Sequence, residues 1–204
     1  MLAPHLQVES GQETILAVAL GAALATIGGF LASQFERRIH RLERQRNAVL
    51  MFGEVLAGLR LLIDLASETR GRGEPYGRVT ERMVRAAQRE AELFNRNREL
   101  LYDVRDQALR TQIQSILVRM TLAIDGILSS YQAIDVATGG AGNAGDGKSI
   151  ADPTLKGFVN DRTFAFDYAV ELASEIKPIL AKLGRVAKQS FDTHEAFIRR
   201  SAAN

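Results

Sequence analysis

The sequence contains no cysteine and no tryptophan, and only four of its 204 residues are proline. The absence of cysteine excludes a disulfide framework, thiolate zinc sites, iron–sulfur clusters and a cysteine nucleophile. Pro4, Pro75 and Pro153 fall outside the periodic segments, and only Pro178 lies inside one. Because so few residues break helices, we expect a mostly helical protein.

The chain also lacks the residue patterns of catalytic and cofactor sites. Its three histidines, His5, His40 and His194, do not have the spacing of metal ligands. No G-x-S-x-G nucleophile elbow is present. The net charge is only +2 and aromatic residues make up 6%, too few for a base-stacking platform. We therefore expect no enzyme, no cofactor, no metal site and no nucleic-acid partner.

Charge is missing altogether from Thr14 to Ser33, within the run TILAVALGAALATIGGFLASQF at residues 14–35. About 20 apolar residues at a rise of ~1.5 Å span the ~30 Å hydrocarbon core of a bilayer. A buried core helix of this length would seldom lack every charge. A cleaved signal peptide would begin with basic residues and have a shorter apolar region, whereas Glu9 and Glu13 precede this run. The run predicts an uncleaved transmembrane helix.

The residues that follow the run predict its orientation. They include five arginines: Arg37, Arg38, Arg41, Arg44 and Arg46. Positive flanks stay in the cytoplasm. We expect residues 1–13 to be a short extracytoplasmic N-terminus and residues 36–204 to be cytoplasmic, in a cell (inner) membrane. The arginines also suit anionic lipid headgroups, although serving only as a topology signal explains them equally well.

Small residues recur every four positions along the same run. They are Ala17, Gly21, Ala25, Gly29 and Ser33. Such a ridge lets a second helix approach closely, which favours a homodimer in the membrane. An alanine-rich segment also produces such ridges by chance, and the sequence does not separate the two interpretations.

The remainder of the chain has helical periodicity. Between residues 42 and 66 the apolar residues keep a seven-residue spacing, in a stripe wide enough for a bundle. The two columns are Leu42, Val49, Leu56 and Ile63, and Phe52, Leu59 and Ala66. No helix stop separates Ser33 from Thr69, so the transmembrane helix is expected to continue into the first cytoplasmic helix.

Three further helices are predicted. The second runs from about Arg78 to Asn97, and the stretch 98–103 is ambiguous, with Asp103 as a possible cap. The third is marked by a seven-residue repeat from Ile113 to Ile134, and the last extends over about 161–200. We predict an all-α protein: a single N-terminal transmembrane helix followed by an antiparallel up-and-down bundle of about four helices, with a glycine-rich loop at 138–152.

The apolar side of the second helix is expected to comprise Val79, Met83, Ala86, Ala87, Leu93 and Phe94. Its arginines Arg78, Arg82, Arg85 and Arg89 share one face. That face is either solvated, as charged helix faces usually are, or it meets acidic lipid or an acidic partner. On the last helix the buried side is expected at Ala169, Leu172, Ile176, Ile179, Leu183 and Val186.

The stretch GNAGDGKS at 142–149 matches the P-loop pattern at Gly142, Gly147, Lys148 and Ser149. A P-loop follows a buried strand and opens a helix, so that backbone N–H groups point at the phosphates. Here a helical pattern precedes the match, and Pro153 follows Lys148 closely. We therefore interpret the stretch as a glycine-rich linker. A melting temperature that rises with ATP, and no longer does so after Lys148→Ala, would favour a nucleotide site.

Taken together, these features favour a membrane-anchored, non-enzymatic helical protein that acts by self-association, scaffolding or conformational coupling to an unidentified cytoplasmic protein. Two alternatives stay open. One is a nucleotide-binding protein that uses residues 142–149. The other is an extracytoplasmic helical sensor, which would require Arg37–Arg46 to cross the membrane and a second span, and the sequence has no second uncharged run of ~18 residues.

Overall fold

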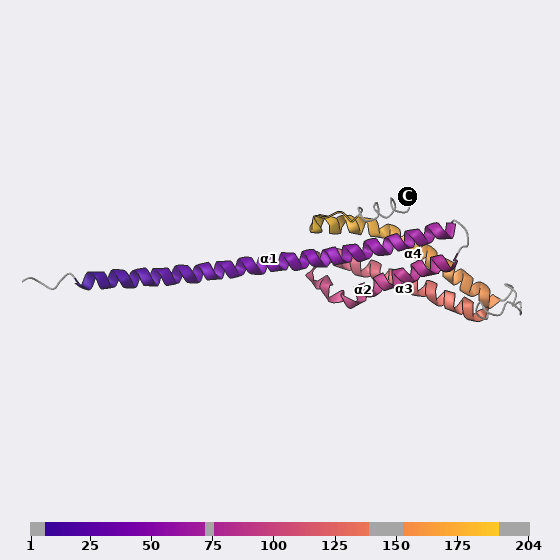
Figure 1. The fold of residues 1–204 in the computed structure, drawn as a ribbon, viewed down its shortest axis with the longest axis horizontal. Coiled ribbons are helices and arrows are strands. Elements are labelled where there is room, and N and C mark those ends of the chain that lie inside the picture. The colour runs from indigo at the N-terminus through magenta and orange to yellow at the C-terminus, as the bar shows by residue number, and fades with distance from the viewer. Residues whose placement is uncertain (1–6, 72–75, 139–152, 192–204) are drawn as a thin grey trace, which may run out of the picture. The chain divides into compact units, whose positions relative to one another are not determined.

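The computed structural model describes residues 7–71, 76–138 and 153–191, without the side chains of residues 7–15 and 17. Nearly all of these residues are helical, and none of them forms a strand. Figure 1 shows the order of the elements. They are α1 (Gln7–Gly71), α2 (Arg78–Arg96), the 3-10 helix η1 (Arg98–Asp103), α3 (Gln107–Ala137) and α4 (Pro153–Ala187). The predicted all-helical class is confirmed.

The chain divides into two compact units, Met1–Arg44 and Gln45–Asn204. Helix α1 contributes to both, because its 65 residues contain no proline that would remove a backbone hydrogen bond. The expected continuation of the N-terminal helix through residues 33–69 is confirmed.

The second unit is a helical bundle with one hydrophobic core. From α1 the core takes both predicted columns, and Val49, Phe52, Leu56, Leu59 and Ile63 are fully buried. Leu42 differs from the prediction. It lies in the first unit and its exposed fraction is 57%. The seven-residue repeat therefore begins before the first buried residue of the core.

Helix α2 packs along α1 through contacts near both of its ends. The rings of Phe52 and Phe94 meet edge to face with centroids 6.1 Å apart. At the other end, the hydroxyls of Thr69 and Thr80 are 3.1 Å apart. Phe52 precedes Thr69 in α1, whereas Phe94 follows Thr80 in α2, so the two helices are antiparallel.

The buried face of α2 is rotated from the predicted one. Val84 is fully buried, whereas Val79 and Leu93 are exposed by 55% and 42%. Residues 80, 84, 87, 91 and 94 form the buried stripe, with spacings of three and four. The prediction was wrong at positions 79 and 93 and left out Val84 and Ala91, because apolar residues lie on more than one side of the segment and the helix buries only one face.

The ambiguous stretch at 98–103 is the 3-10 helix η1, so it does interrupt the α-helical chain. The carboxylate that caps the next helix belongs to Asp106, not Asp103. Its side chain accepts a hydrogen bond from the backbone N–H of Leu109 at 3.0 Å. This bond satisfies one of the unpaired N–H groups in the first turn of α3.

Helices α3 and α4 pack side by side and supply the rest of the core (Figure 1). The predicted face of α3 is confirmed from Ile113 to Ile127 by the burial of Ile113, Met120, Ala123 and Ile127, whereas Ile134 is partly exposed. Helix α4 begins at Pro153, eight residues before the predicted start, because proline suits the first helical turn. It ends at Ala187, although the prediction extended to about 200, and residues 192–200 lie outside the described part.

Val186 and Pro178 are both exposed on α4. Val186 is 40% exposed, not buried. Pro178 is exposed and lies inside the helix, which continues on both sides of it. After Ala187 the backbone of Lys188 has a φ of 55°, and the N–H of Gln189 donates to the carbonyl of Gly184 at 3.1 Å. The chain thereby leaves the helix, and Phe191 lies buried.

Within the described residues, one helix is long and apolar enough to cross a membrane, and it is α3, with a mean hydropathy of 1.2 over its most apolar window. Half of that window is buried inside the structure, as in the core helix of a soluble domain. This criterion does not confirm the predicted N-terminal span. The α3 match is itself weak evidence for a membrane, because length and composition alone produce it.

Candidate functional site

The N-terminal part of α1 is covered with exposed apolar side chains. Eight large hydrophobic residues between 16 and 35 have exposed fractions of 51–67%: Leu16, Val18, Leu20, Leu24, Ile27, Phe30, Leu31 and Phe35. Soluble proteins seldom expose a contiguous apolar surface of this kind, and such surfaces usually mark an interaction with a membrane or a protein.

Two hydroxyl groups of this segment form hydrogen bonds within the helix. The hydroxyl of Thr26 donates to the carbonyl of Ala22 at 2.8 Å, and that of Ser33 donates to the carbonyl of Phe30 at 3.0 Å. A helix in lipid must satisfy its polar groups internally, because no water reaches them. The local geometry of Thr26 and Ser33 therefore suits an apolar environment.

The small-residue ridge lies on this segment. A Cβ placed at Gly21 or Gly29 would meet no described atom within 4 Å. Ala25 is exposed and Ser33 is partly exposed, while the side chain of Ala17 lies outside the described part. The ridge is thus uncovered over the positions that the structure describes, and its proposed role in dimerisation stays a prediction.

The five arginines after the segment are all exposed, namely Arg37, Arg38, Arg41, Arg44 and Arg46. Beside them, Nδ1 of His40 lies 3.4 Å from a carboxylate oxygen of Glu43, one helical turn away. The five arginines lie within ten consecutive residues of α1. They form a basic collar, defined here as these five residues, which suits an anionic surface better than a single small ligand.

The arginine face of α2 is exposed, as the sequence predicts. Arg78, Arg82 and Arg89 are exposed, and Arg85 binds Glu81 on the same helix at 2.9 and 2.7 Å. Pairs with a spacing of four residues at the surface contribute about 0.3–0.5 kcal/mol each. The face is compatible with a solvated surface or with an acidic partner.

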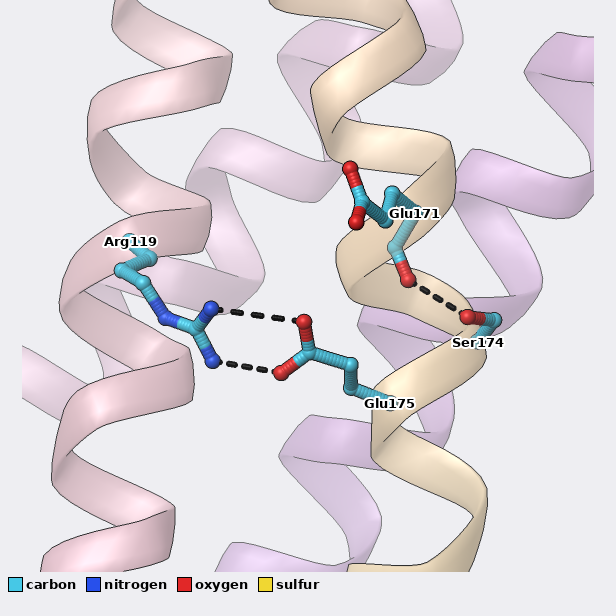
Figure 2. Close-up of polar contacts among 4 residues, drawn as sticks. All are labelled: Arg119, Glu171, Ser174 and Glu175. Carbon is cyan, nitrogen blue, oxygen red and sulfur yellow. Dashed lines mark hydrogen bonds and ion pairs between the residues drawn. The ribbon is translucent and has the colours of Figure 1, made fainter.

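Polar contacts between α3 and α4 are seen in Figure 2. The guanidinium of Arg119 donates to both carboxylate oxygens of Glu175, at 3.3 and 2.5 Å. This hydrogen bonding raises the pKa of Arg119 above its ordinary value. On α4, Ser174 directly precedes Glu175 and Glu171 lies one turn before it, and the Ser174 hydroxyl donates to the Glu171 carbonyl at 2.6 Å. These contacts join two helices and hold no arrangement of acid, base and nucleophile.

A hollow surface lies at the end of α4. A cavity of about 420 Å³ beside Phe191 is lined by the basic residues Lys177, Arg185 and Lys188 together with apolar side chains. It is open to solvent, and its lining contains neither a histidine nor a carboxylate. The described residues contain no group of His, Asp and Glu side chains that could hold a metal ion.

Two tyrosines and an arginine meet at the end of the bundle where α1 connects to α2. Cζ of Arg162, from α4, lies 4.2 Å from the ring centroid of Tyr76 and 5.0 Å from that of Tyr131, from α3. Tyr76 also packs edge to face on Phe166, with centroids 5.7 Å apart. The sequence reasoning missed these residues. In the sequence, Tyr131 continues the seven-residue spacing of Leu117 and Ile124, but this spacing does not indicate which side chains it contacts.

The P-loop-like residues Gly142, Gly147, Lys148 and Ser149 lie outside the described part of the chain, as do His5 and His194. The element before that stretch is helix α3, which ends at Ala137, whereas a P-loop follows a strand. This observation favours the linker interpretation over a nucleotide site.

No family model, no curated protein and no solved structure matches this chain.

Proposed function

We propose that this protein is anchored in a membrane by residues 14–35 as a single span and acts through protein–protein interactions of its helical bundle. The observation that carries the proposal is the exposed apolar surface from Leu16 to Phe35, on a stretch of α1 that contains no charged residue. Burying such side chains in water-free surroundings contributes about 25 cal/mol per Å² of apolar area. A lipid bilayer supplies those surroundings along the whole length of the segment.

Helix α3 is the rival for the span, and its packing argues against it. Ile113, Leu117, Met120 and Ile127 on α3 are fully buried in the core of the bundle. Insertion of α3 into lipid would remove these side chains from their contacts with the other helices. None of the described side chains between residues 16 and 35 belongs to this core.

The basic collar supports an orientation with the bundle in the cytoplasm. The same collar is suited to anionic headgroups at the membrane surface. The small-residue ridge is suited to a second copy of the chain. The bundle has helix-to-helix ion pairs but no catalytic arrangement among its described residues, so we propose scaffolding or conformational coupling, and not turnover, as its mode of action.

The absence of cysteine makes the test direct. Single cysteines are introduced at Gln7 and at Tyr102, which is 82% exposed, and intact cells are treated with a membrane-impermeant maleimide. We expect Gln7→Cys to react and Tyr102→Cys to react only after lysis. Reaction of Tyr102→Cys in intact cells would contradict the orientation and favour the extracytoplasmic sensor.

Alkaline extraction of membranes identifies the span itself. Leu24→Arg places a charge near the centre of the proposed span, at a cost of about 2.5–3.5 kcal/mol, and should release protein into the soluble fraction. Leu122→Arg is the matched control, because Leu122 lies on α3 with a similar exposed fraction of 66%. The opposite pattern, with release by Leu122→Arg alone, would assign the span to α3.

A further inference from the structure

The side chains of Tyr76, Tyr131 and Arg162, named here the Arg162 cluster, come from three separate elements. The guanidinium of Arg162 lies over both tyrosine rings, at 4.2 and 5.0 Å from their centroids. Cation–π contacts of this kind contribute roughly 0.5–2 kcal/mol each. These contacts explain why aromatic rings lie beside Arg162, but a phenylalanine ring would make the same contact without a hydroxyl group.

The cation–π contacts do not explain why these two residues carry hydroxyl groups. Oη of Tyr76, Oη of Tyr131 and Nε of Arg162 are buried atoms without a hydrogen-bond partner among the described residues. A buried donor without a partner costs about 1–3 kcal/mol. Three of them in one cluster, each able to donate a proton, indicate a missing acceptor.

The charges around the cluster indicate that the missing acceptor is negatively charged. Arg70, which stacks on Tyr76 at 5.0 Å, is neutralised by Asp167. The nearby carboxylate of Glu81 is engaged by Arg85. Among the described side chains no carboxylate pairs with Arg162, and burial lowers its pKa. One positive charge is therefore left uncompensated beside two hydroxyl donors.

We propose that the Arg162 cluster binds an oxyanion group, a carboxylate or a phosphate, whose oxygens accept hydrogen bonds from Nε of Arg162 and from the hydroxyls of Tyr76 and Tyr131. Each of the three side chains is partly exposed, but the three polar atoms are themselves buried, so an oxyanion reaches them only when the side chains shift. A charge-assisted bond to Arg162 provides most of the affinity, and the hydroxyls add direction. This site is independent of the membrane anchor.

The test compares the full-length protein with the double variant Tyr76→Phe/Tyr131→Phe, which keeps both rings and removes both donors. The probes are inorganic phosphate and acetate, with chloride at matched ionic strength as the reference. Binding is followed by the melting temperature and by the Hε resonance of Arg162. We expect both oxyanions, or one of them, to raise the melting temperature and shift the resonance, and the double variant to weaken binding about tenfold.

The same variant separates a ligand site from a structural one. Without oxyanion, the hydroxyls have no partner, so the double variant should melt at the same temperature or higher. A lower melting temperature without oxyanion would overturn the proposal, because the hydroxyls would then be stabilising the fold. Tyr102→Phe, on an exposed tyrosine, is the control for the loss of a hydroxyl alone.

A second experiment identifies the source of the anion. Vesicles of phosphatidylcholine are compared with vesicles that also contain phosphatidylglycerol. A shift of the Arg162 resonance with phosphatidylglycerol alone assigns the oxyanion to a lipid headgroup, and a shift with dissolved phosphate or acetate assigns it to a small molecule. If no probe exceeds chloride, or if the double variant responds like the unaltered protein, the proposal is wrong.

Discussion

The ring of Phe191 occupies the position that a side chain at Gly53 would need. A Cβ added to Gly53 would lie 2.1 Å from Cζ of Phe191 and 2.3 Å from its Cε1. Gly53 is on α1 and Phe191 is the last residue described after α4, so this contact closes the chain back onto the first helix of the bundle. The glycine is required by the close approach and not by a turn.

Replacing Gly53 with alanine should therefore displace Phe191 from the core. Overpacking of this kind costs typically 1–3 kcal/mol, and denaturant unfolding of the protein measures it. Gly58→Ala is the control, because a Cβ there lies 3.5 Å from Glu90, an ordinary contact. That change should be neutral or stabilise the helix by up to about 1 kcal/mol. Equal effects of the two changes would argue against the contact.

The cap of α3 gives a second prediction. Asp106→Ala removes the acceptor for the N–H of Leu109 and should lower the free energy of unfolding by about 0.5–2 kcal/mol. Asp103→Ala, three residues earlier, should have little effect. If Asp103→Ala is the more damaging change, the start of α3 differs from the one described.

The ion pair between Arg119 and Glu175 should contribute little to stability. Both side chains are about 40% exposed, at 38% and 42%. A double-mutant cycle with Arg119→Gln and Glu175→Gln should give a coupling of about 0.2–1 kcal/mol. The pair Arg96–Glu92 is longer, at 3.7 Å, and more exposed, so its cycle should give less. A coupling above this range would show that the α3–α4 pair is shielded from solvent.

Stability should fall at high pH because of Tyr131. Burial raises the pKa of Tyr131 to about 12 from an ordinary value of 10.0, against the opposing effect of Arg162 and with smaller contributions from Glu81 and Tyr76. The unfolded chain then loses this proton first, so the stabilisation is complete below pH 10.0 and is lost as the pH rises toward 12.

Chemical unfolding at a series of pH values measures this effect. Tyr131→Phe should flatten the fall between pH 10.0 and about 12, whereas Tyr102→Phe, at an exposed position, should retain it. An unchanged profile in the Tyr131→Phe protein would place the titrating group elsewhere.

The ridge on the N-terminal part of α1 gives a prediction about self-association. Leucine at Gly21 and Gly29 would project into open space in a single helix, so the monomer should be unaffected. In a membrane dimer packed through the ridge, the same side chains would separate the helices, and cross-linking should decrease. Ala23→Leu, on the opposite face, is the matched control. Unchanged cross-linking in the glycine variants would show that the ridge is not an interface.

Much of the secondary structure was predictable because helical periodicity is a local property. The repeat through Ile113, Met120 and Ile127 predicted a buried face that the structure confirms. Helix ends were predicted less well. Pro153 begins α4 and Lys188 adopts a left-handed conformation after it, and neither feature follows from apolar spacing. At Val79 and Leu93 the composition suggested burial, but the neighbouring helices cover only one side of α2.

By itself, the sequence determined the helical class, the uncharged segment at 14–35 and the basic collar after it, because charge and periodicity are properties of consecutive residues. Only the tertiary structure decided that Gly53 meets Phe191 and that Tyr76, Tyr131 and Arg162 share one cluster. These residues are separated by tens of positions in the chain. Their proximity depends on how four helices fill one core, and packing of that kind has no signature in the spacing of any single helix.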